Sequence, residues 1–236
     1  MKKAHFFQGM MPIMPTAIHE SGEIDEESQR RLVNYCLENG AVAVGHFGFA
    51  SEFHKITERQ RDKLMRIIID EVAGRVPVFL GVTSPSFLGS AENAQKAADA
   101  GADIIMAMLP YMEVPDSNGA FCFYETLSNA TTLPIIIQDA GHSSGVLTAS
   151  LLIKMFREIE HEAYVKSEGK DFLAKTHTLI KEVGDEMQII GGAAGKHMFH
   201  MLRLGVTAFM TGTEALDLYA SVVSAFLDGK EDDAFH

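Results

Sequence analysis

Eight short apolar runs recur along the chain, and amphipathic segments separate them. The runs span residues 11–15, 41–48, 76–82, 103–110, 134–140, 162–168, 187–192 and 207–212. Each has the length and the β-branched or methionine-rich composition of a strand that is buried on both faces. The segments between them contain helix signals, such as the capping box that Thr57 and Gln60 form at the start of residues 58–72. The chain is therefore predicted to alternate strand and helix from end to end.

Three of the predicted helices end at a glycine that leads directly into a strand, at Gly40, Gly101 and Gly205. This repeated connection, with about eight strand–helix units, favours a closed parallel barrel of the α/β class, the (β/α)8 or TIM barrel. An open doubly wound sheet is the alternative, but such a sheet usually has a glycine-rich phosphate loop after its first strand. Residues 14–17, Met-Pro-Thr-Ala, do not form one.

A single domain is expected over residues 1–236. A chain of 236 residues is long enough for one large core and too short for two ordinary α/β domains. The last predicted helix spans residues 214–227, and only residues 228–236 follow it. A second domain does not fit there.

The charge balance is acidic, with 32 acidic and 20 basic residues and a formal net charge of −12. Because the chain has no long basic run, nucleic acid is not an expected partner. The longest apolar stretches, such as residues 104–110, are far shorter than the about 20 residues that a membrane span needs. Cys36 and Cys122 fall in predicted helices, and the N-terminal residues lack the pattern of a signal peptide. We therefore expect a reduced, cytoplasmic protein with no membrane anchor.

Lys166 is the candidate nucleophile. The reactive groups of a (β/α) barrel lie at the carboxyl ends of its strands, and Lys166 is the only lysine inside an apolar strand run. Burial disfavours the charged form of a lysine, so a free amine becomes available for carbinolamine and Schiff-base formation. Lys166 could instead extend out of the barrel mouth or pair with Glu168 or Asp139, and spacing alone does not separate these interpretations.

Polar residues also end the strand of Lys166 and one other strand. Glu168 lies two residues after Lys166, so alternation places both side chains on one face. A carboxylate beside an amine suits proton transfer next to an iminium carbon, whereas a plain ion pair would leave Lys166 protonated and inert. Gln138 and Asp139 end another apolar run, so at least one of them is expected to face the cavity. That side chain could orient a substrate, and capping a loop is an equally ordinary role.

Two glycine-containing loops are candidate binding segments. Residues 45–54 follow the second strand, and their backbone N–H groups, with the Ser51 hydroxyl, could receive an anion. Residues 191–196, which include Gly192, are similarly open, although paired glycines also suit close packing at a barrel end. Met210, near the end of the last strand, is a further candidate to contact substrate, but core filling explains the methionines most economically.

A divalent-metal site is the alternative chemistry at these strand ends. The side chains that could supply ligands are His46, Glu52, His54, Asp139, His142 and Glu168. None of them shows a sharp metal-binding spacing, such as two histidines four residues apart on a helix. No metal and no cofactor are therefore predicted.

Together these residues resemble the dihydrodipicolinate synthase and N-acetylneuraminate lyase superfamily of Schiff-base barrels. The resemblance covers essentially the whole chain, and besides the strand that ends in Lys166 it rests on residues 15–16, 22–25, 48–52, 74–78, 100–103, 110–111 and 133–135. It implies a barrel that acts on a 2-oxo acid, with Lys166 as the Schiff-base lysine of the family.

Departures from the family pattern affect the predicted pocket. The tyrosine that the family has at the end of the fifth strand is Gln138 here, so the usual proton relay is missing. The paired threonines that hold the substrate carboxylate in the family are Phe49 and Ala50, which leaves Ser51 and backbone amides for that role.

Two more departures argue against dihydrodipicolinate synthesis. A second family tyrosine, which follows Tyr111 in the alignment, is Met112 here. The arginine that the synthase uses for the carboxylate of its aldehyde substrate aligns near Ser143.

The branch that this chain resembles instead contains the 2-keto-3-deoxy sugar acid dehydratases, notably the L-2-keto-3-deoxyarabonate dehydratases. This resemblance rests on Gln138-Asp139, on Lys166 with Glu168, and on Gly191-Gly192. It implies a hydro-lyase in which Lys166 condenses with C2, Glu168 removes a C3 proton, and the enamine expels the C4 hydroxyl while Gln138 holds sugar hydroxyls. A pyruvate-dependent aldolase would break the C3–C4 bond of the same iminium, and a non-catalytic 2-oxo acid sensor would bind without turnover.

The resemblance also bears on assembly. Family members usually continue into a helical C-terminal region that commonly joins subunits, and in this sequence that region is expected to be absent or truncated. A small-molecule 2-oxo acid is the expected partner, and a homo-oligomer is the expected assembly.

Overall fold

The computed structural model describes residues 7–140 and 145–235. Within them, eight strands form one parallel sheet in the order β1-β8-β7-β6-β5-β4-β3-β2. The strands are β1 Gly9–Met10, β2 Val44–His46, β3 Val78–Gly81, β4 Ile104–Ala107, β5 Ile135–Asp139, β6 Glu162–Ser167, β7 Gln188–Gly191 and β8 Ala208–Phe209. All eight predicted strand runs therefore overlap or lie beside an observed strand.

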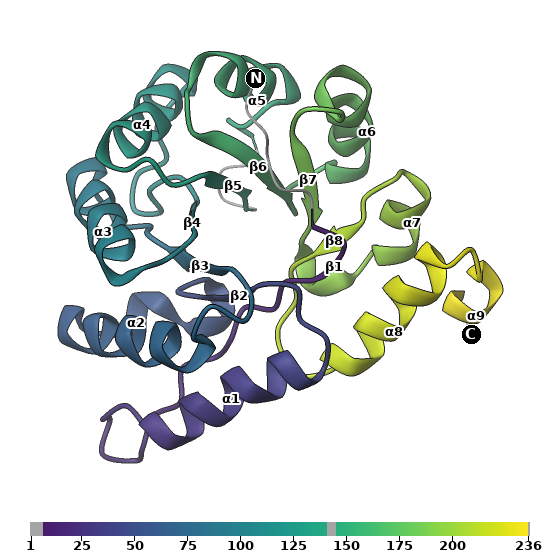
Figure 1. Cartoon of the computed structure of the whole chain (residues 1–236). Coiled ribbons are helices and arrows are strands. Elements are labelled where there is room, and N and C mark those ends of the chain that lie inside the picture. The colour runs from purple at the N-terminus through teal and green to yellow at the C-terminus, as the bar shows by residue number, and fades with distance from the viewer. Residues whose placement is uncertain (1–6, 141–144, 236) are drawn as a thin grey trace.

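The two edges of this sheet meet, so the sheet closes into a barrel (Figure 1). On one side β1 pairs with β8. On the other side the chain from Met10 to Ile13 runs beside residues 41–45, which lead into β2, with parallel bridges to Ala41 and to Gly45 in the middle of that strand. The Gly45 N–H donates to Pro12 O at 2.9 Å, which continues the ladder across the seam. The predicted TIM barrel is confirmed.

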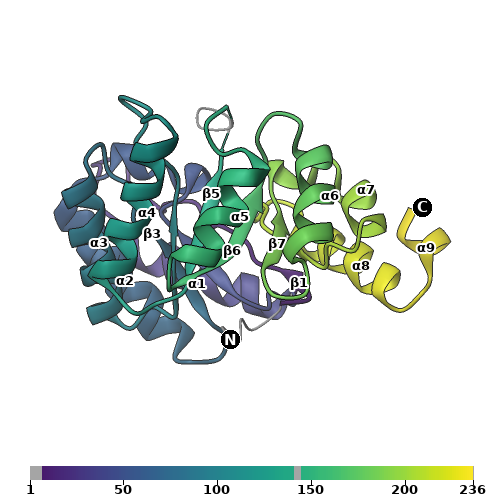
Figure 2. The ribbon, with the colours of Figure 1, turned by 90° about the horizontal axis from the view of Figure 1, so that it is seen from above.

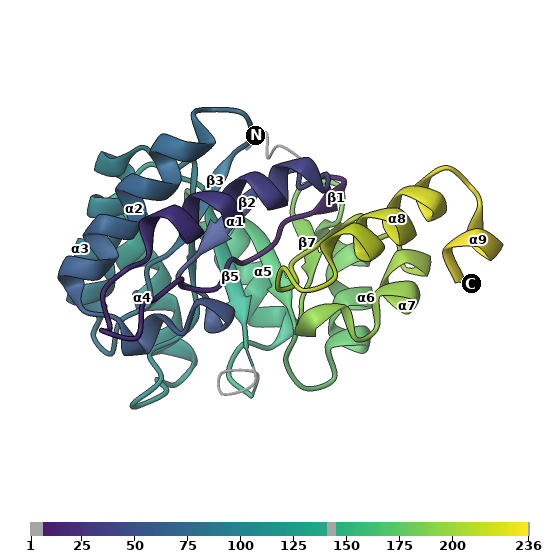
Figure 3. The same ribbon diagram turned by 90° about the horizontal axis from the view of Figure 1, so that it is seen from below.

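One helix follows each strand, and these helices surround the barrel (Figure 1). They are α1 Glu26–Glu38, α2 Glu58–Val72, α3 Phe87–Ala100, α4 Ser117–Ala130, α5 Ala149–Glu158, α6 Phe172–Val183, α7 Met198–Arg203 and α8 Leu216–Leu227. The helices α1 and α8 are neighbours where the first and last strands meet (Figure 3). A short helix, α9 Glu231–Phe235, follows α8 at the periphery of the molecule (Figure 2). Among the described helices, none is long and apolar enough to cross a membrane.

The predicted helix boundaries form for the local reasons that the sequence suggests. The Thr57 hydroxyl accepts from the Gln60 N–H, and the Gln60 side chain accepts from the Thr57 N–H at 2.9 Å, which completes the capping box of α2. Gly40, Gly101 and Gly205 have φ of 78°, 97° and 94°, in the left-handed region that glycine tolerates best. The two cysteines, both free, lie in helices as expected, in α1 and α4.

The first strand differs from the prediction, which placed it at residues 11–15. Regular pairing is confined to Gly9–Met10, and the following residues continue along the barrel wall with single bridges. Pro12 and Pro15 explain the difference, because a proline has no N–H to donate to a ladder.

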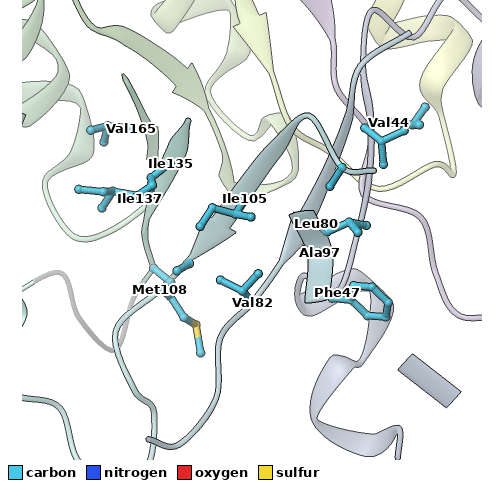
Figure 4. Close-up of a cluster of buried hydrophobic side chains, with 14 of the residues drawn as sticks. Val44, Phe47, Leu80, Val82, Ala97, Ile105, Met108, Ile135, Ile137 and Val165 are labelled. Atoms are coloured by element: carbon cyan, nitrogen blue, oxygen red, sulfur yellow. The ribbon is translucent and has the colours of Figure 1, made fainter. Parts of the chain in front are cut away.

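Successive residues of each strand face, in turn, two different hydrophobic cores. The interior of the barrel is filled by a cluster that includes Met11, Phe79, Met106, Ile136, Tyr164, Ile190 and Met210. The layer between the barrel and the helices is filled by a larger cluster that includes Val44, Leu80, Ile105, Ile137 and Val165 (Figure 4).

This alternation places the polar residues at the ends of β5 and β6. Gln138 and Lys166 lie two residues after Ile136 and Tyr164, so they face the barrel interior above its apolar filling. Asp139 is one residue further along β5 and faces the helix layer. The register of the sheet also pairs Gln138 with Lys166 on the two adjacent strands.

Candidate active site

Lys166 lies near the carboxyl end of β6, faces the interior of the barrel and is 5% exposed. Its Nζ is 3.1 Å from Oε2 of Glu168. Period-two alternation therefore brings the amine and the carboxylate together as predicted, and in this structure the two groups form an ion pair. The ion pair that the sequence left open as an inert alternative is therefore present. The same contact also makes the carboxylate an acceptor for the proton that the amine must lose before it can attack a carbonyl.

Glu168 is held by donors on both of its oxygens. Besides the contact with Lys166, its Oε2 accepts from the Ala193 N–H at 3.0 Å, and its Oε1 accepts from Nε2 of Gln138 at 2.6 Å. Burial by itself raises the pKa of Glu168, but the charge of Lys166, the Ala193 N–H and the Gln138 amide outweigh it and hold that pKa below its usual value. The carboxylate is therefore ionised and fixed in orientation.

Glycine is required next to this carboxylate. A Cβ on Gly192 would lie 2.7 Å from Oε2 and 2.8 Å from Cβ of Glu168. Ala193, which donates to Glu168, has a left-handed φ of 52°, a strained conformation for a residue other than glycine. The loop after β7 thus contributes packing space and one N–H to the Lys166 cluster, and the observed role of Gly192 is to let Glu168 approach.

Asp139 is not part of the cluster around Lys166. Its Oδ2 accepts from Nζ of Lys175 at 2.6 Å, and Lys175 also donates to Leu147 O at 2.7 Å. Asp139 is fully buried, and its Oδ1 has no hydrogen-bond partner. Burial raises the pKa of Asp139 to about 6, although Lys175 opposes the shift. The predicted contact of Asp139 with substrate is corrected, because the side chain faces α6 rather than the interior.

The predicted anion-binding loop folds as two short 3-10 helices, Phe49–Ser51 and Phe53–Lys55. Ser51 is fully buried, and its hydroxyl donates to Met14 O at 2.6 Å. That proton is therefore engaged within the protein, so the loop would hold an anion through backbone N–H groups rather than through Ser51. Phe49 is 42% exposed, and its ring packs on Phe53 with 6.2 Å between centroids. Ala50 is exposed as well.

Met210 is 1% exposed in the interior cluster. Its N–H donates to Gly191 O at 2.8 Å. The structure thus gives Met210 the core-filling role that the sequence favoured for the methionines.

The potential metal ligands within the described residues do not converge. In residues 7–140 and 145–235, no group of three or more His, Cys, Asp or Glu side chains could hold a metal ion. Glu52 pairs with Lys55, and His46 is fully buried on the outer face of β2. Two residues named from the sequence, His142 and Ser143, lie outside the described residues.

Sequence reasoning missed two buried cations, Lys175 and Arg61. Lys175 lies on the helix α6, yet its side chain is only 9% exposed. Arg61 is 5% exposed on α2. The signal for Arg61 was its spacing from Leu64, Met65 and Ile68, which places it on the apolar face of the helix.

Comparisons with known proteins place the chain in a family. The Dihydrodipicolinate synthetase family model matches residues 6–235. An L-2-keto-3-deoxyarabonate dehydratase of Azospirillum brasilense is 35% identical over 235 residues, which are 97% of this chain and 75% of that protein. A 4-hydroxy-tetrahydrodipicolinate synthase of Phocaeicola vulgatus is 27% identical over 86% of this chain and 68% of that protein.

Solved structures share the fold. A prophage protein of the dihydrodipicolinic acid synthase family from E. coli K12, in complex with pyruvate, superposes with a TM-score of 0.91 at 24% identity, over 98% of this chain and 79% of its own. N-acetylneuraminate lyase from Mycoplasma synoviae superposes with a TM-score of 0.87 at 19% identity, over 97% of this chain and 78% of its own.

Proposed function

Since the chain belongs to the Dihydrodipicolinate synthetase family, we propose that it is a lyase that removes water from a 2-keto-3-deoxy sugar acid through a Schiff base on Lys166. The 35% identity with a named dehydratase over 97% of the chain supports the reaction. The observation that carries the proposal is the cluster itself. An amine lies 3.1 Å from a carboxylate, and the Gln138 amide holds the other oxygen of that carboxylate.

The first step is formation of the Schiff base. Glu168 accepts the proton of the Lys166 ammonium, and the free amine attacks C2 of the 2-oxo acid to give a carbinolamine. The protonated Glu168 returns its proton to the carbinolamine hydroxyl, which leaves as water. The product of this step is an iminium between Nζ of Lys166 and C2, beside an ionised Glu168.

The second step is elimination. The iminium acidifies the C3 protons, and Glu168 removes one of them to give an enamine. The electron pair of the enamine expels the C4 hydroxyl, which takes up the proton from Glu168 and leaves as water. Hydrolysis of the conjugated iminium then frees Lys166 and releases an unsaturated 2-oxo acid. Gln138 orients Glu168 throughout and is our candidate to hold a substrate hydroxyl as well.

The substrate carboxylate needs a site of its own. The N–H groups of residues 48–50, at the start of the first 3-10 helix, are our candidates for it, because the end of β2 opens at the same end of the parallel barrel as that of β6. The Ser51 N–H is excluded, since it donates to Gly48 O. Phe49 and Ala50 contribute backbone there, and both side chains are exposed.

Trapping and product analysis test the proposal. The protein is incubated with pyruvate and cyanoborohydride and mapped by peptide mass spectrometry, and separately with 2-keto-3-deoxy-L-arabonate to identify the products. We expect a reduced adduct on Lys166 and loss of one water from the sugar acid. Lys166→Arg should abolish the adduct, whereas Lys170→Arg, a change at an exposed lysine nearby, should leave it intact.

Each other outcome has a defined meaning. Release of pyruvate and glycolaldehyde would show cleavage of the C3–C4 bond, so the enzyme would be an aldolase. An adduct with no product from a panel of deoxy keto acids would indicate a 2-oxo acid sensor. The absence of any adduct on Lys166 would refute Schiff-base chemistry.

We further propose that the protein acts in the cytoplasm as a homo-oligomer on a small-molecule 2-oxo acid. Both cysteines are free thiols, which suits a reducing compartment. Light scattering coupled to size-exclusion chromatography tests the assembly, and a monomeric mass at micromolar concentration would contradict it.

A further inference from the structure

Arg61 is a buried cation that contacts Phe47, the residue before the loop that we propose as the site of the substrate carboxylate. It lies on the inner face of α2, and it donates from Nη1 to Gly81 O at 2.8 Å, at the carboxyl end of β3. Its guanidinium carbon lies 4.3 Å from the centroid of the Phe47 ring. Glu58 and Asp62 on the same helix and Tyr111 interact with it electrostatically, but among the described residues no carboxylate forms an ion pair with it.

Burying a guanidinium without an ion-pair partner is unfavourable, so a chain retains one only where something else compensates. The aromatic face of Phe47 and the Gly81 carbonyl supply part of that compensation. A positive charge that no carboxylate neutralises also favours an anion nearby.

The backbone that Arg61 covers is strained. Phe47 has a left-handed φ of 63°, which is uncommon for a residue other than glycine. Its carbonyl lies so close to Gly81 that a Cβ there would be 2.1 Å from Phe47 O. The end of β2 is thus pressed against the end of β3, and Arg61 contacts both. This turn sets the direction in which residues 48–51 leave the strand.

The far end of the same loop is held by a second set of contacts. The Thr16 hydroxyl donates to Ser51 O at 2.5 Å, and Ser51 donates to Met14 O.

The buried His46 ring packs on Phe47 with 4.5 Å between centroids, and burial, with the nearby charge of Arg61, lowers the pKa of His46 to about 3. His46 is neutral, so Arg61 supplies the positive charge at this end of β2.

From this arrangement we infer that Arg61 is a positioning residue for the carboxylate of the substrate. It holds the strained turn after β2, and its charge favours an anion at the N–H groups of residues 48–50. This inference rests on the proposed Schiff-base function. It predicts a role in binding the carboxylate and no role in the chemistry at Lys166.

Two ketones separate these roles. Pyruvate has a carboxylate, and hydroxyacetone has a hydroxymethyl group in its place. The concentration of each that gives half-maximal cyanoborohydride trapping on Lys166 is measured for the wild-type protein and for Arg61→Met, Arg61→Lys and Arg66→Met. Arg66 is an exposed arginine of the same helix, so its variant is a matched control.

Arg61→Met should raise the half-maximal pyruvate concentration roughly tenfold, because it removes a unit positive charge beside the bound carboxylate. The hydroxyacetone value should stay within about twofold of the wild type. Arg61→Lys keeps the charge but loses the planar stack on Phe47, so a smaller loss that is again confined to pyruvate is expected. Arg66→Met should match the wild type with both ketones. If Arg61→Met does not give a cooperative thermal unfolding transition, Arg61→Lys serves as the test.

An equal loss with both ketones, or no loss with either, would overturn the role of Arg61. These outcomes differ from failure of the proposed function, in which the wild-type protein itself would be modified on Lys166 by neither ketone.

Discussion

At the scale of single residues, Glu168 is the most constrained polar side chain of the described site. Three donors on three different segments converge on its two oxygens: Lys166, Gln138 and the Ala193 N–H. A carboxylate that is already ionised and oriented needs little reorganisation when it accepts a proton. Its environment therefore suits a group that shuttles a proton between an amine, a hydroxyl and a carbon acid.

Replacement of this carboxylate should affect turnover more than folding. Glu168→Gln keeps the size of the side chain but removes its basicity, so we expect kcat for sugar acid dehydration to fall by at least about 100-fold. Circular dichroism should remain that of the wild type. Glu182→Gln, at an exposed position on α6, is the control and should be fully active. A Glu168→Gln enzyme within about threefold of wild-type kcat would exclude Glu168 as the base.

Asp139 should make stability depend on pH. Its pKa in the folded protein is about 6, because burial raises it, while an unfolded aspartate titrates near about 3.9. The folded state therefore binds this proton more tightly, and the stabilisation that results is complete below about pH 4 and is lost as the pH rises to about 6. Relative to Asp139→Asn, the free energy of unfolding of the wild type should fall by up to about 3 kcal/mol across that window.

Urea unfolding at several pH values from 4 to 7 measures this difference. Asp185→Asn, at an exposed position, provides the matched control and should run parallel to the wild type. Parallel curves for Asp139→Asn and the wild type would mean that Asp139 does not titrate in this range.

At the scale of elements, the connection after β7 positions Glu168. A methyl group at Gly192 would overlap Glu168, so Gly192→Ala should displace the carboxylate from Lys166. We expect a loss of kcat of about 10-fold or more, since misplacement by a fraction of an ångström weakens proton transfer. Gly145→Ala is the comparison, because a Cβ there meets nothing within 4 Å. If both variants retain wild-type kcat, the packing at Gly192 has no bearing on the chemistry.

The helix α2 depends on its capping box and carries Arg61 to the end of β3. Thr57→Ala removes the hydroxyl that accepts from the Gln60 N–H, and such a change lowers stability by about 1 kcal/mol. Thr57→Ser keeps the hydroxyl and should restore most of the loss. Chemical denaturation of the three proteins checks this, and equal stabilities would show that the cap contributes nothing.

At the scale of the whole molecule, closure of the barrel is what concentrates polar groups at one end. Every strand has a paired neighbour on both sides, so inward side chains meet only one another. Apolar residues such as Phe79, Ile136 and Tyr164 fill the interior, and Gln138 and Lys166 lie above them. A lysine and a carboxylate there are largely shielded from water, and they lie at the end where barrels of this kind bind ligands.

The sequence predicted the strand–helix alternation, the barrel and the Lys166–Glu168 pair because these follow from periodicity. The sequence-based prediction was wrong where the direction of a side chain depends on a hydrogen-bond partner that is distant in the sequence. Asp139 was expected at the substrate and lies on α6, and Ser51 was expected to bind an anion but uses its hydroxyl on Met14 O. Neither partner is near in sequence, so no local pattern could reveal either contact.

Taken by itself, the sequence determined the alternating order of strands and helices and which lysine sits in a buried strand, since local spacing and burial preference encode both. Only the tertiary structure decided that Gln138 and Ala193 would hold Glu168, and that Arg61 would lie behind the loop after β2. These contacts join segments that are 20 to 30 residues apart. They exist only because the closed sheet brings the ends of successive strands to one end of the barrel. Close packing there determines which side chains can reach one another.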